Sequence, residues 1–435
     1  MERILWICDL LLAVIGFLYI SRTVYLVVGL FTTKKYAPAR RQHRYAIVIA
    51  ARNEEKVIGH LLDSIAAQDY PAELITTFVV ADNCLDGTAQ CAREHGAICY
   101  ERRDPTRRTK GYALEFLFDC IRRDYGIERF EGYFVFDADN LLRYDFVSRM
   151  NDAFDSGAPI VTSYRNTKNF DSGWLCAGYA LHWLRTSRLE SCARSAFGVS
   201  TRLQGTGYLF ASELVRNGWH YTSLTEDREF SSDAVVRGYP ILYQHEAQFY
   251  DEQPTSLRIA LRQRIRWAKG NLWAFTHFNR GLWRRMLSVR SWKEKYVSYD
   301  MMMTNFPVSL FTVFLKFCKA AVTVALFIAA AKYDAISYAT FGTALFQILI
   351  FEHLGTIPMA WLVFFTERKR TPPMRWYKKL WYSLMFPIFG MIGDLATWIA
   401  AFRRVTWEPI PHHASIAIHE IEHHIPHGQC RQGKR

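Results

Sequence analysis

The sequence predicts an α/β protein with a mainly parallel, Rossmann-like sheet, accompanied by transmembrane and interfacial α-helices. Three observations support this fold class. Strand-like and helix-like segments alternate over residues 45–136, apolar runs of membrane-spanning length lie toward both ends, and a basic amphipathic segment lies between. Of the 435 residues, 50% are hydrophobic and 15% are aromatic. This composition suits a large domain with a full core that is joined to membrane helices.

Short apolar runs without helical spacing predict buried strands, because they are rich in β-branched and aromatic residues. These runs are 45–51, 75–81, 98–100, 133–136 and 160–163. Helical patterns follow the first three runs. Strands that alternate with helices form right-handed crossovers and hence a parallel sheet, whose ligand crevice lies outside the C-terminal ends of the strands.

Polar residues come directly after three of these strands. Asn53 and Glu54 follow the first, Asp82 follows the second, and Asp137 and Asp139 follow the run at 133–136. Two carboxylates this close repel each other unless a cation lies between them, and Mg²⁺ or Mn²⁺ would supply one. Taken alone, Asp-x-Asp is more often an ordinary turn. Because all three groups converge on one edge of the sheet, we expect a binding site there.

The segment Ser-Leu-Thr-Glu-Asp at 223–227 predicts the start of a helix. Ser223 and Glu226 have the spacing of a capping box, and acidic residues suit the first turn of a helix. This role leaves Asp227 free to point toward a site.

A basic amphipathic helix is predicted over 256–276, with Gln263, Arg266 and Trp267 on one face because they are spaced i, i+3 and i+4. A planar guanidinium suits a diphosphate, and an indole can stack on a sugar ring. Alternatively, the helix lies on the membrane with Trp267 as an interfacial anchor. Both roles can hold at once.

Together these segments resemble the motifs of family 2 glycosyltransferases with a GT-A fold. They occur in the family's order: IVIAARNEE at 47–55, VVADNCLDGT at 79–88, Lys110-Gly111, Asp-Ala-Asp at 137–139, Thr-Glu-Asp at 225–227 and Gln-x-x-Arg-Trp at 263–267. The last two resemble the membrane-embedded processive synthases of cellulose, chitin, hyaluronan and poly-N-acetylglucosamine. The family usually has two aspartates where this chain has Ala81-Asp82, so only the second position carries over.

The resemblance implies an inverting transfer from a UDP-sugar. The residue matching Asp82 would hold the uracil, and the one matching Asp139 would hold the Mg²⁺ or Mn²⁺ that bridges the diphosphate. The match to Asp227 is the base that takes the acceptor's proton, a role worth about 10²- to 10⁴-fold in rate. The expected catalytic residues are Asp227 and Glu226; those at the donor are Asn53, Glu54, Asp82, Lys110, Asp137, Gln263 and Arg266; Trp267 is expected at the acceptor, and Asp139 and Asp137 at the metal.

The implied function is addition of sugars to a growing cell-surface or extracellular polysaccharide, processive and coupled to export. The alternative within the enzyme class is a non-processive transferase that adds one sugar to a lipid-linked acceptor. From another class, the chain could be a transporter or scaffold whose nucleotide domain has lost activity. The sugar, the linkage and any accessory subunit stay open.

Apolar runs at 4–31, 305–331 and 338–365 predict membrane spans, and 380–402 could span, kink or re-enter. Basic residues at 34–44 place the following domain in the cytoplasm, so we expect a multi-pass protein of the cell membrane. The expected divisions are a transmembrane helix at 1–33, a cytosolic GT-A domain at 34–254, interfacial helices at 255–303, transmembrane helices at 304–404 and a His-rich tail at 405–435.

The net charge is +13, and many of the basic residues lie next to apolar segments of the sequence. This arrangement favours contact with anionic lipid headgroups over binding of nucleic acid. The tail contains six histidines, at 412, 413, 419, 423, 424 and 427. A metal-binding tail is conceivable, but a flexible or surface-lying tail is favoured because no carboxylate or cysteine framework fixes a geometry.

Overall fold

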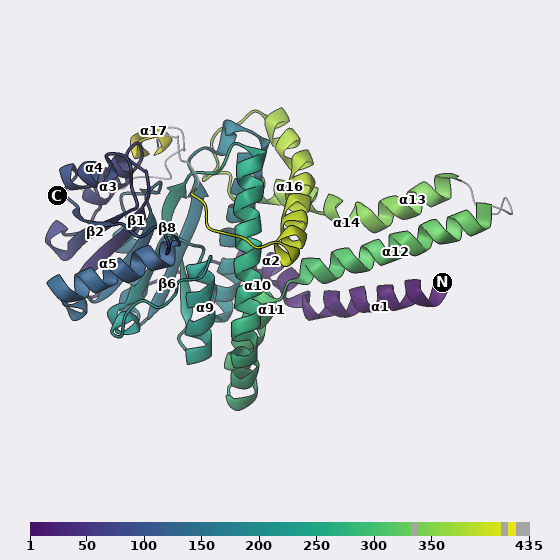
Figure 1. The fold of residues 1–435 in the computed structure, drawn as a ribbon, viewed down its shortest axis with the longest axis horizontal. Helices are drawn as coiled ribbons and strands as arrows, with labels where there is room; N and C mark the ends of the chain where they lie inside the picture. Colours follow the sequence, from purple (N-terminus) through teal and green to yellow (C-terminus); the bar gives the residue numbers. More distant parts are fainter. Residues whose placement is uncertain (332–337, 410–415, 423–435) are drawn as a thin grey trace.

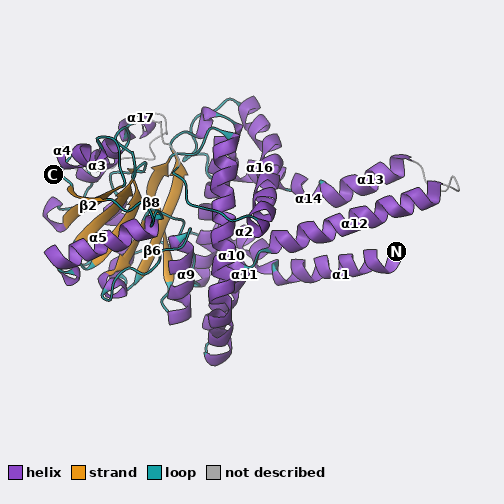
Figure 2. Ribbon diagram, in the orientation of Figure 1, coloured by secondary structure: helices purple, strands orange, loops and turns teal. Residues whose placement is uncertain are grey.

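A computed structural model describes residues 1–331, 338–409 and 416–422. The described residues form an eight-stranded sheet in the order β3-β2-β1-β4-β7-β6-β8-β5 (Figures 1 and 2). The strands are β1 (Tyr45–Ala51), β2 (Ile75–Asp82), β3 (Ile98–Arg102), β4 (Gly132–Asp137), β5 (Leu141–Leu142), β6 (Ile160–Thr167), β7 (Tyr208–Ala211) and β8 (Ile241–Asp251). All five predicted strands are present.

The sheet is parallel through β3, β2, β1 and β4, and again between β6 and β8. Tyr45 in β1 is in register with Ile75 of β2 and Gly132 of β4. The antiparallel pairs involve β7 and the short β5. The predicted mainly parallel α/β sheet is therefore confirmed, and the C-terminal ends of β1, β2 and β4 meet at one edge.

Helices cover both faces of the sheet, which explains why its strands read as continuous apolar runs. Phe134 and Phe136 of β4 pack on the side of α3 (Ile58–Ala66) and α6 (Phe146–Asp155). Tyr133 on the same strand packs on the side of α5 (Lys110–Asp124) and α9 (Glu226–Arg237). A smaller helix, α4 (Thr88–Glu94), lies beside α3.

The sequence analysis did not anticipate β8, because buried polar residues interrupt its apolar pattern. Gln244, His245 and Gln248 are buried within the strand. Their polar atoms have partners: Gln244 Nε2 donates to the carbonyl of Arg149 (2.8 Å), and Gln248 Nε2 donates to the Tyr250 hydroxyl (2.6 Å). This strand brings Asp251 to the same edge of the sheet as Asp137.

The predicted capping box is wrong. Helix α9 begins at Glu226, after Thr225, and Ser223 instead donates its backbone N–H to Glu229 Oε2 (2.9 Å). Thr225 is fixed by α10 (Leu257–Ser288), since a Cβ on Gly270 would lie 2.0 Å from Thr225 Oγ1. The Thr225 side chain therefore packs directly on the backbone of α10, immediately before α9 begins.

Helix α7 (Trp174–Arg185) continues through a π-helical turn at Thr186–Ser191 into α8 (Cys192–Phe197). The expected interfacial segment is α10 followed by α11 (Trp292–Asn305). Figure 1 shows α16 (Trp376–Phe402) alongside α10, both running across the direction of α1 (Glu2–Leu18), α12 (Val308–Ala331) and α13 (Tyr338–Leu349).

Two helices of the described residues are long and apolar enough to cross a membrane, Val308–Ala329 and Trp376–Phe402. A third is obtained if α1 and α2 (Ile20–Phe31) count as one broken span, bent by 42°. The bend replaces the single helix expected over 4–31. It turns α2 against the π-helical turn and α8, and Arg22 lies 3.5 Å from Asp300 of α11 and 3.9 Å from Glu190.

The continuous helix expected over 338–365 is also replaced, by α13, α14 (Phe351–Leu354) and α15 (Thr356–Thr366). Pro358 accounts for the break between α14 and α15, because it has no N–H to bond to the carbonyl of Leu354 four residues earlier. In contrast, α16 runs unbroken through Pro387. Residues 332–334, expected between two spans, and all tail histidines except His419 lie outside the described residues.

Candidate active site

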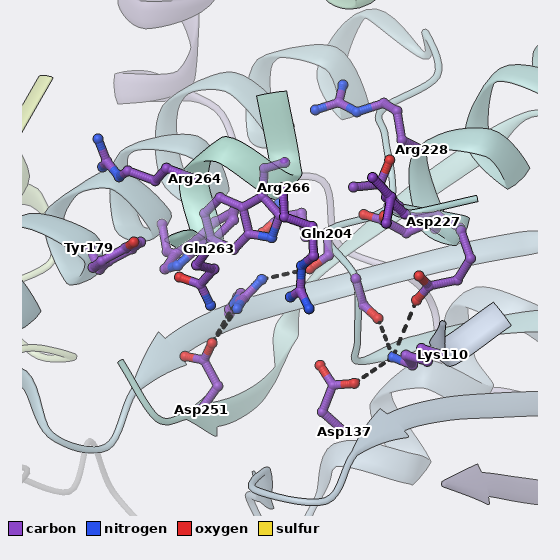
Figure 3. Close-up of a pocket in the computed structure, with 18 of the residues that line it drawn as sticks. Lys110, Asp137, Tyr179, Gln204, Asp227, Arg228, Asp251, Gln263, Arg264 and Arg266 are labelled. Atoms are coloured by element: carbon purple, nitrogen blue, oxygen red, sulfur yellow. Dashed lines mark hydrogen bonds and ion pairs between the residues drawn. The ribbon is translucent and has the colours of Figure 1, made fainter. Parts of the chain in front are cut away.

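A cavity of about 660 Å³ lies between the C-terminal edge of the sheet and the helices α7, α10 and α16 (Figure 3). Its lining includes the predicted residues Glu54, Asp82, Lys110, Asp137, Asp139, Glu226, Asp227, Gln263, Arg266 and Trp267. Asn53 does not line it. Its exposed side chain accepts a hydrogen bond from Leu85 N–H (2.8 Å), and its φ of +57° marks a tight turn after β1.

The turn after β4 holds its two carboxylates in fixed positions. The backbone N–H of Asp137 donates to Thr206 Oγ1 (2.9 Å) and to Asn140 Oδ1 (3.2 Å). Asp139 is buried, and its Oδ2 accepts a hydrogen bond from the backbone N–H of Glu252 (2.8 Å). The loop before β7 and the end of β8 thus brace the Asp-Ala-Asp motif.

Lys110 places a positive charge among these carboxylates. Its Nζ donates to Asp137 Oδ1 (2.5 Å) and to the carbonyl of Gly205 (2.7 Å), and lies 3.5 Å from Glu226 Oε1 (Figure 3). Burial alone would lower the pKa of Lys110, but Asp137 and Glu226 outweigh it and raise that pKa. Burial raises the pKa of Glu226 to about 7 against the opposing charge of Lys110, and Asp227 adds to the rise.

Asp82 is buried between two arginines, Arg52 and Arg102. Its Oδ2 accepts from Arg52 Nη2 (2.7 Å) and its Oδ1 from Arg102 Nη1 (2.6 Å). Burial raises the pKa of Asp82, and the hydrogen bonds from the arginines only partly offset that effect. A nucleotide base at this edge would therefore meet an arginine-paired carboxylate.

Two further groups in the cavity were missed by the sequence analysis, Asp251 at the end of β8 and its partner Arg165 on β6. Arg165 Nε donates to Asp251 Oδ2 (2.7 Å), and Arg165 Nη1 donates to the carbonyl of Gln204 (2.6 Å). Burial raises the pKa of Asp251 to about 6, opposed by Arg165 and assisted by Asp139. Asp251 Oδ1 and both polar atoms of the Gln204 side chain are buried without a hydrogen-bond partner.

The face of α10 that carries Gln263, Arg266 and Trp267 lines the cavity, as predicted. Trp267 packs edge-on against Tyr179 (6.0 Å between ring centroids) and Trp183 (5.8 Å), forming an aromatic wall. Gln263 Oε1 and Arg266 Nε are buried without a hydrogen-bond partner. Burial lowers the pKa of Arg266. Polar groups that lack partners beside an aromatic wall suit a ligand that is both polar and ring-shaped.

Comparison with known proteins identifies the family. The profile of a family described as "Glycosyltransferase like family 2" matches residues 43–270, which is more than half of the chain. The chain belongs to this family. The expected activity class is thereby confirmed at the level of a family 2 glycosyltransferase.

The curated relatives of this chain include two bacterial proteins named as glycosyltransferases. The chain is 23% identical over 313 residues, 67% of each chain, to the "Probable glycosyltransferase YdaM" of Bacillus subtilis. It is 48% identical over 60 residues to the "4,4'-diaponeurosporenoate glycosyltransferase" of Staphylococcus aureus, a match that spans only 15% of that protein.

The fold is similar to that of the mannosyltransferase PcManGT from Pyrobaculum calidifontis, solved in complex with GDP-Man and Mn²⁺. The TM-score is 0.53 at 17% identity, and the match covers 91% of this chain and 99% of the other. This structural similarity shows that the two proteins share a GT-A-like fold.

Trp407 also lines the glycosyltransferase cavity. After α16 the chain runs back toward the sheet (Figure 1), and Trp407 joins the lining. The Trp407 ring centroid lies 4.6 Å from Arg52 Cζ and 6.0 Å from Arg266 Cζ. This residue was expected in a peripheral tail, because nothing in its local sequence signals a return to the site.

The carboxylate oxygens of the Asp-Ala-Asp motif are ligands of the kind that a hard divalent cation such as Mg²⁺ or Mn²⁺ prefers. Asp137 and Asp139 both line the cavity, and the Asp137 side chain is 38% exposed there. Among the residues that the structure describes, no group of three or more His, Cys, Asp or Glu side chains could hold a metal ion by itself. A cation at this motif would need further oxygen ligands, which a diphosphate and water can supply.

Proposed function

We propose that this protein is an inverting glycosyltransferase that takes a sugar from a UDP-sugar and adds it to one acceptor molecule that enters from the membrane side. The observation that carries the proposal is the extent of one cavity. It is lined at one end by Asp137 and Asp139 on the sheet edge, and at the other by Phe389 and Gly393 on the apolar helix α16.

The donor would bind at the sheet edge. Arg52 and Asp82 lie where the uracil is expected, and Lys110 and Arg266 would face the diphosphate. Mg²⁺ or Mn²⁺ held by Asp139 and Asp137 would offset the charge that develops on the departing diphosphate. The buried atoms of Gln263 and Arg266 that lack partners would gain hydrogen bonds when the donor binds.

Asp227 is the proposed base. It lines the cavity beside Lys110 and Glu226 at the start of α9. It removes the acceptor proton as the acceptor oxygen attacks the anomeric carbon, and the bond from that carbon to the UDP oxygen breaks on the opposite face. Trp267 supports a sugar ring at the same time, so one displacement inverts the anomeric centre.

The cavity geometry favours a single transfer to a lipid-linked acceptor over processive export. Residues of α11, α15 and α16 line the cavity, but in the described part of the chain no residue of α1, α12 or α13 does. A growing polymer would need a passage through the spanning helices, whereas a lipid could reach the cavity beside α16. The Gln-x-x-Arg-Trp motif is what supports the processive reading as a second candidate.

The placement of α1, α12 and α13 away from the sheet also supports a multi-pass protein of the cell membrane with a cytoplasmic catalytic domain (Figure 2).

UDP release from the purified full chain in detergent, with Mg²⁺ or Mn²⁺, tests the proposal. UDP-glucose, UDP-N-acetylglucosamine, UDP-glucuronate and UDP-galactose are supplied singly and in pairs with a membrane lipid extract, and the products are sized. We expect release with one donor and a short, lipid-extractable product. A high-mass product would favour the processive candidate, and release at background with every donor would contradict the proposed activity.

A further inference from the structure

Three arginines line the cavity on the far side of Asp227 from the sheet edge. Arg185 ends α7, Arg202 lies in the loop before β7, and Arg228 follows Asp227 on α9. We call these three residues the arginine cluster. In Figure 3 the Arg228 side chain points away from Lys110 and Asp137, the groups expected at the donor diphosphate.

The guanidinium groups of the arginine cluster have few partners. Among the described residues, the Arg202 side chain makes no hydrogen bond or ion pair. Arg228 Nη1 and Arg185 Nε are buried without a hydrogen-bond partner, and Arg185 Nη2 lies 3.2 Å from Glu190 Oε1. Burial and neighbouring positive charge, chiefly that of Arg228, lower the pKa of Arg202 to about 10. Buried cations without partners are costly, so the protein is poised to gain an anion here.

The carboxylates nearby do not balance the arginine cluster, because other arginines already share them. Glu190 also contacts Arg194 (3.5 Å), and Asp300 contacts Arg194 (2.9 Å). Arg22 lies near both acids. Arg22, Arg185, Arg194 and Arg202 thus share Glu190 and Asp300, and Arg228 has Asp227 beside it. These five arginines and three carboxylates leave an excess of two positive charges. A single carboxylate on a ligand would leave part of this charge unpaired, whereas a phosphate ester carries about −1.5 to −2.

We propose that the arginine cluster binds a phosphate or diphosphate group on the lipid-linked acceptor. This inference rests on the proposed function and specifies its acceptor. One guanidinium group can donate two parallel N–H hydrogen bonds to the oxygens of a phosphate. Three arginines that line the same cavity therefore offer enough donors for a phosphate or a diphosphate. The same cavity continues to Phe386, Phe389 and Gly390 of α16, where an apolar lipid chain would lie. Because Arg228 adjoins Asp227, a phosphate held there would keep the acceptor beside the base.

The test uses binding and turnover of the full chain in detergent with matched probes. The probes are a short isoprenyl monophosphate, the matching diphosphate, the free isoprenol, a fatty acid of similar length and inorganic pyrophosphate. The variants are Arg202→Gln and Arg228→Gln, with Arg202→Lys to retain charge without the planar group. Arg216→Gln is the control, since Arg216 pairs with the exposed Glu128 (2.9 Å) and does not line the cavity. Thermal stabilisation by UDP shows whether each variant has folded.

We expect the phosphorylated isoprenyl probes to bind at least about tenfold more tightly than the isoprenol or the fatty acid. Arg202→Gln and Arg228→Gln should each weaken that binding at least about tenfold, Arg202→Lys less, and Arg216→Gln not at all. Pyrophosphate that binds as tightly as the isoprenyl diphosphate would identify a free phosphate as the ligand.

Equal binding of the isoprenol and its phosphates, or unchanged binding in both glutamine variants, would overturn the assignment. UDP release that persists in that case would leave the proposed function standing. No release with any donor or probe would instead remove the proposed function itself.

Discussion

The two ends of the cavity differ in charge and in how their side chains are held. At the sheet edge, carboxylates follow strands directly and are fixed by backbone hydrogen bonds, as Asp139 is by Glu252 N–H. At the helical end, arginines come from α7, α9 and a loop, and Arg202 has no side-chain partner among the described residues. The sheet edge is preorganised for a cation and a diphosphate, whereas the helical end needs an anionic ligand to complete it.

Asp227 lies between the two ends, so its replacement separates catalysis from binding. We expect Asp227→Asn to lower turnover at least about a hundredfold, because the amide cannot take the proton that the acceptor loses as it attacks. UDP binding and phosphorylated-probe binding should both persist. Steady-state UDP release and UDP-dependent thermal shift measure the two effects.

Asp233→Asn on the same helix is a matched control, since Asp233 bonds the Tyr221 hydroxyl (2.7 Å) outside the cavity. Near-normal turnover in Asp227→Asn would remove Asp227 as the base.

Replacing Asp139 tests whether the sheet edge alone holds the metal. Asp139→Asn should reduce activity by roughly 10- to 100-fold at limiting Mn²⁺, with partial recovery at high Mn²⁺, because one charged oxygen ligand is lost. Binding of isoprenyl phosphate should stay unchanged, and a titration of activity against Mn²⁺ measures the shift. The exposed Asp69→Asn serves as control. If Asp139→Asn weakened isoprenyl phosphate binding as much as it weakened the response to Mn²⁺, the two ends of the cavity would form one site.

The sheet edge could be predicted because each of its residues follows a strand that is recognisable from composition. The end of β4 is the clearest case, since four apolar residues run directly into Asp137. The second half of the sheet was harder. Gln244 and His245 interrupt β8, so the position of Asp251 could not be inferred, although an acidic residue at a strand end is the same signal.

The helical end depends on contacts that no local pattern encodes. Arg228 adjoins a recognisable motif, but only the fold shows that its guanidinium lacks a partner. Trp407 reaches the site because α16 packs along α10 and returns the chain to the sheet. The misplaced cap at Ser223 has a similar origin, since the approach of Gly270 to Thr225 overrides a spacing that by itself fits a capping box.

Trp407 tests whether the segment after α16 belongs to the donor end. Trp407→Ala should raise the KM for the donor by about three- to tenfold, because it removes a cation–π contact with Arg52, the residue that also holds Asp82. Turnover at saturating donor should change less. Trp376→Ala, which removes an exposed indole at the start of α16, is the control. An effect confined to phosphorylated-probe binding would place Trp407 at the helical end instead.

The smallest expected effect concerns Glu226, the carboxylate that both ends share. Its pKa in the folded protein, about 7, lies above the ordinary value of 4.5, so the folded chain binds this proton more tightly than the unfolded chain. The stability that this provides is complete below about pH 4.5 and is lost as the pH rises through about 7. Glu226→Gln mimics the protonated acid, and its stability should lack this loss.

Between pH 5 and 8, wild type should therefore lose on the order of 1 kcal/mol relative to Glu226→Gln, or about 2 °C in Tm. Thermal unfolding in detergent across this range measures the difference, and the exposed Glu213→Gln should follow wild type. A Tm difference between wild type and Glu226→Gln that stays constant with pH would show that Lys110 keeps Glu226 ionised. The boundary between the two ends would then carry a fixed ion pair between Lys110 and Glu226.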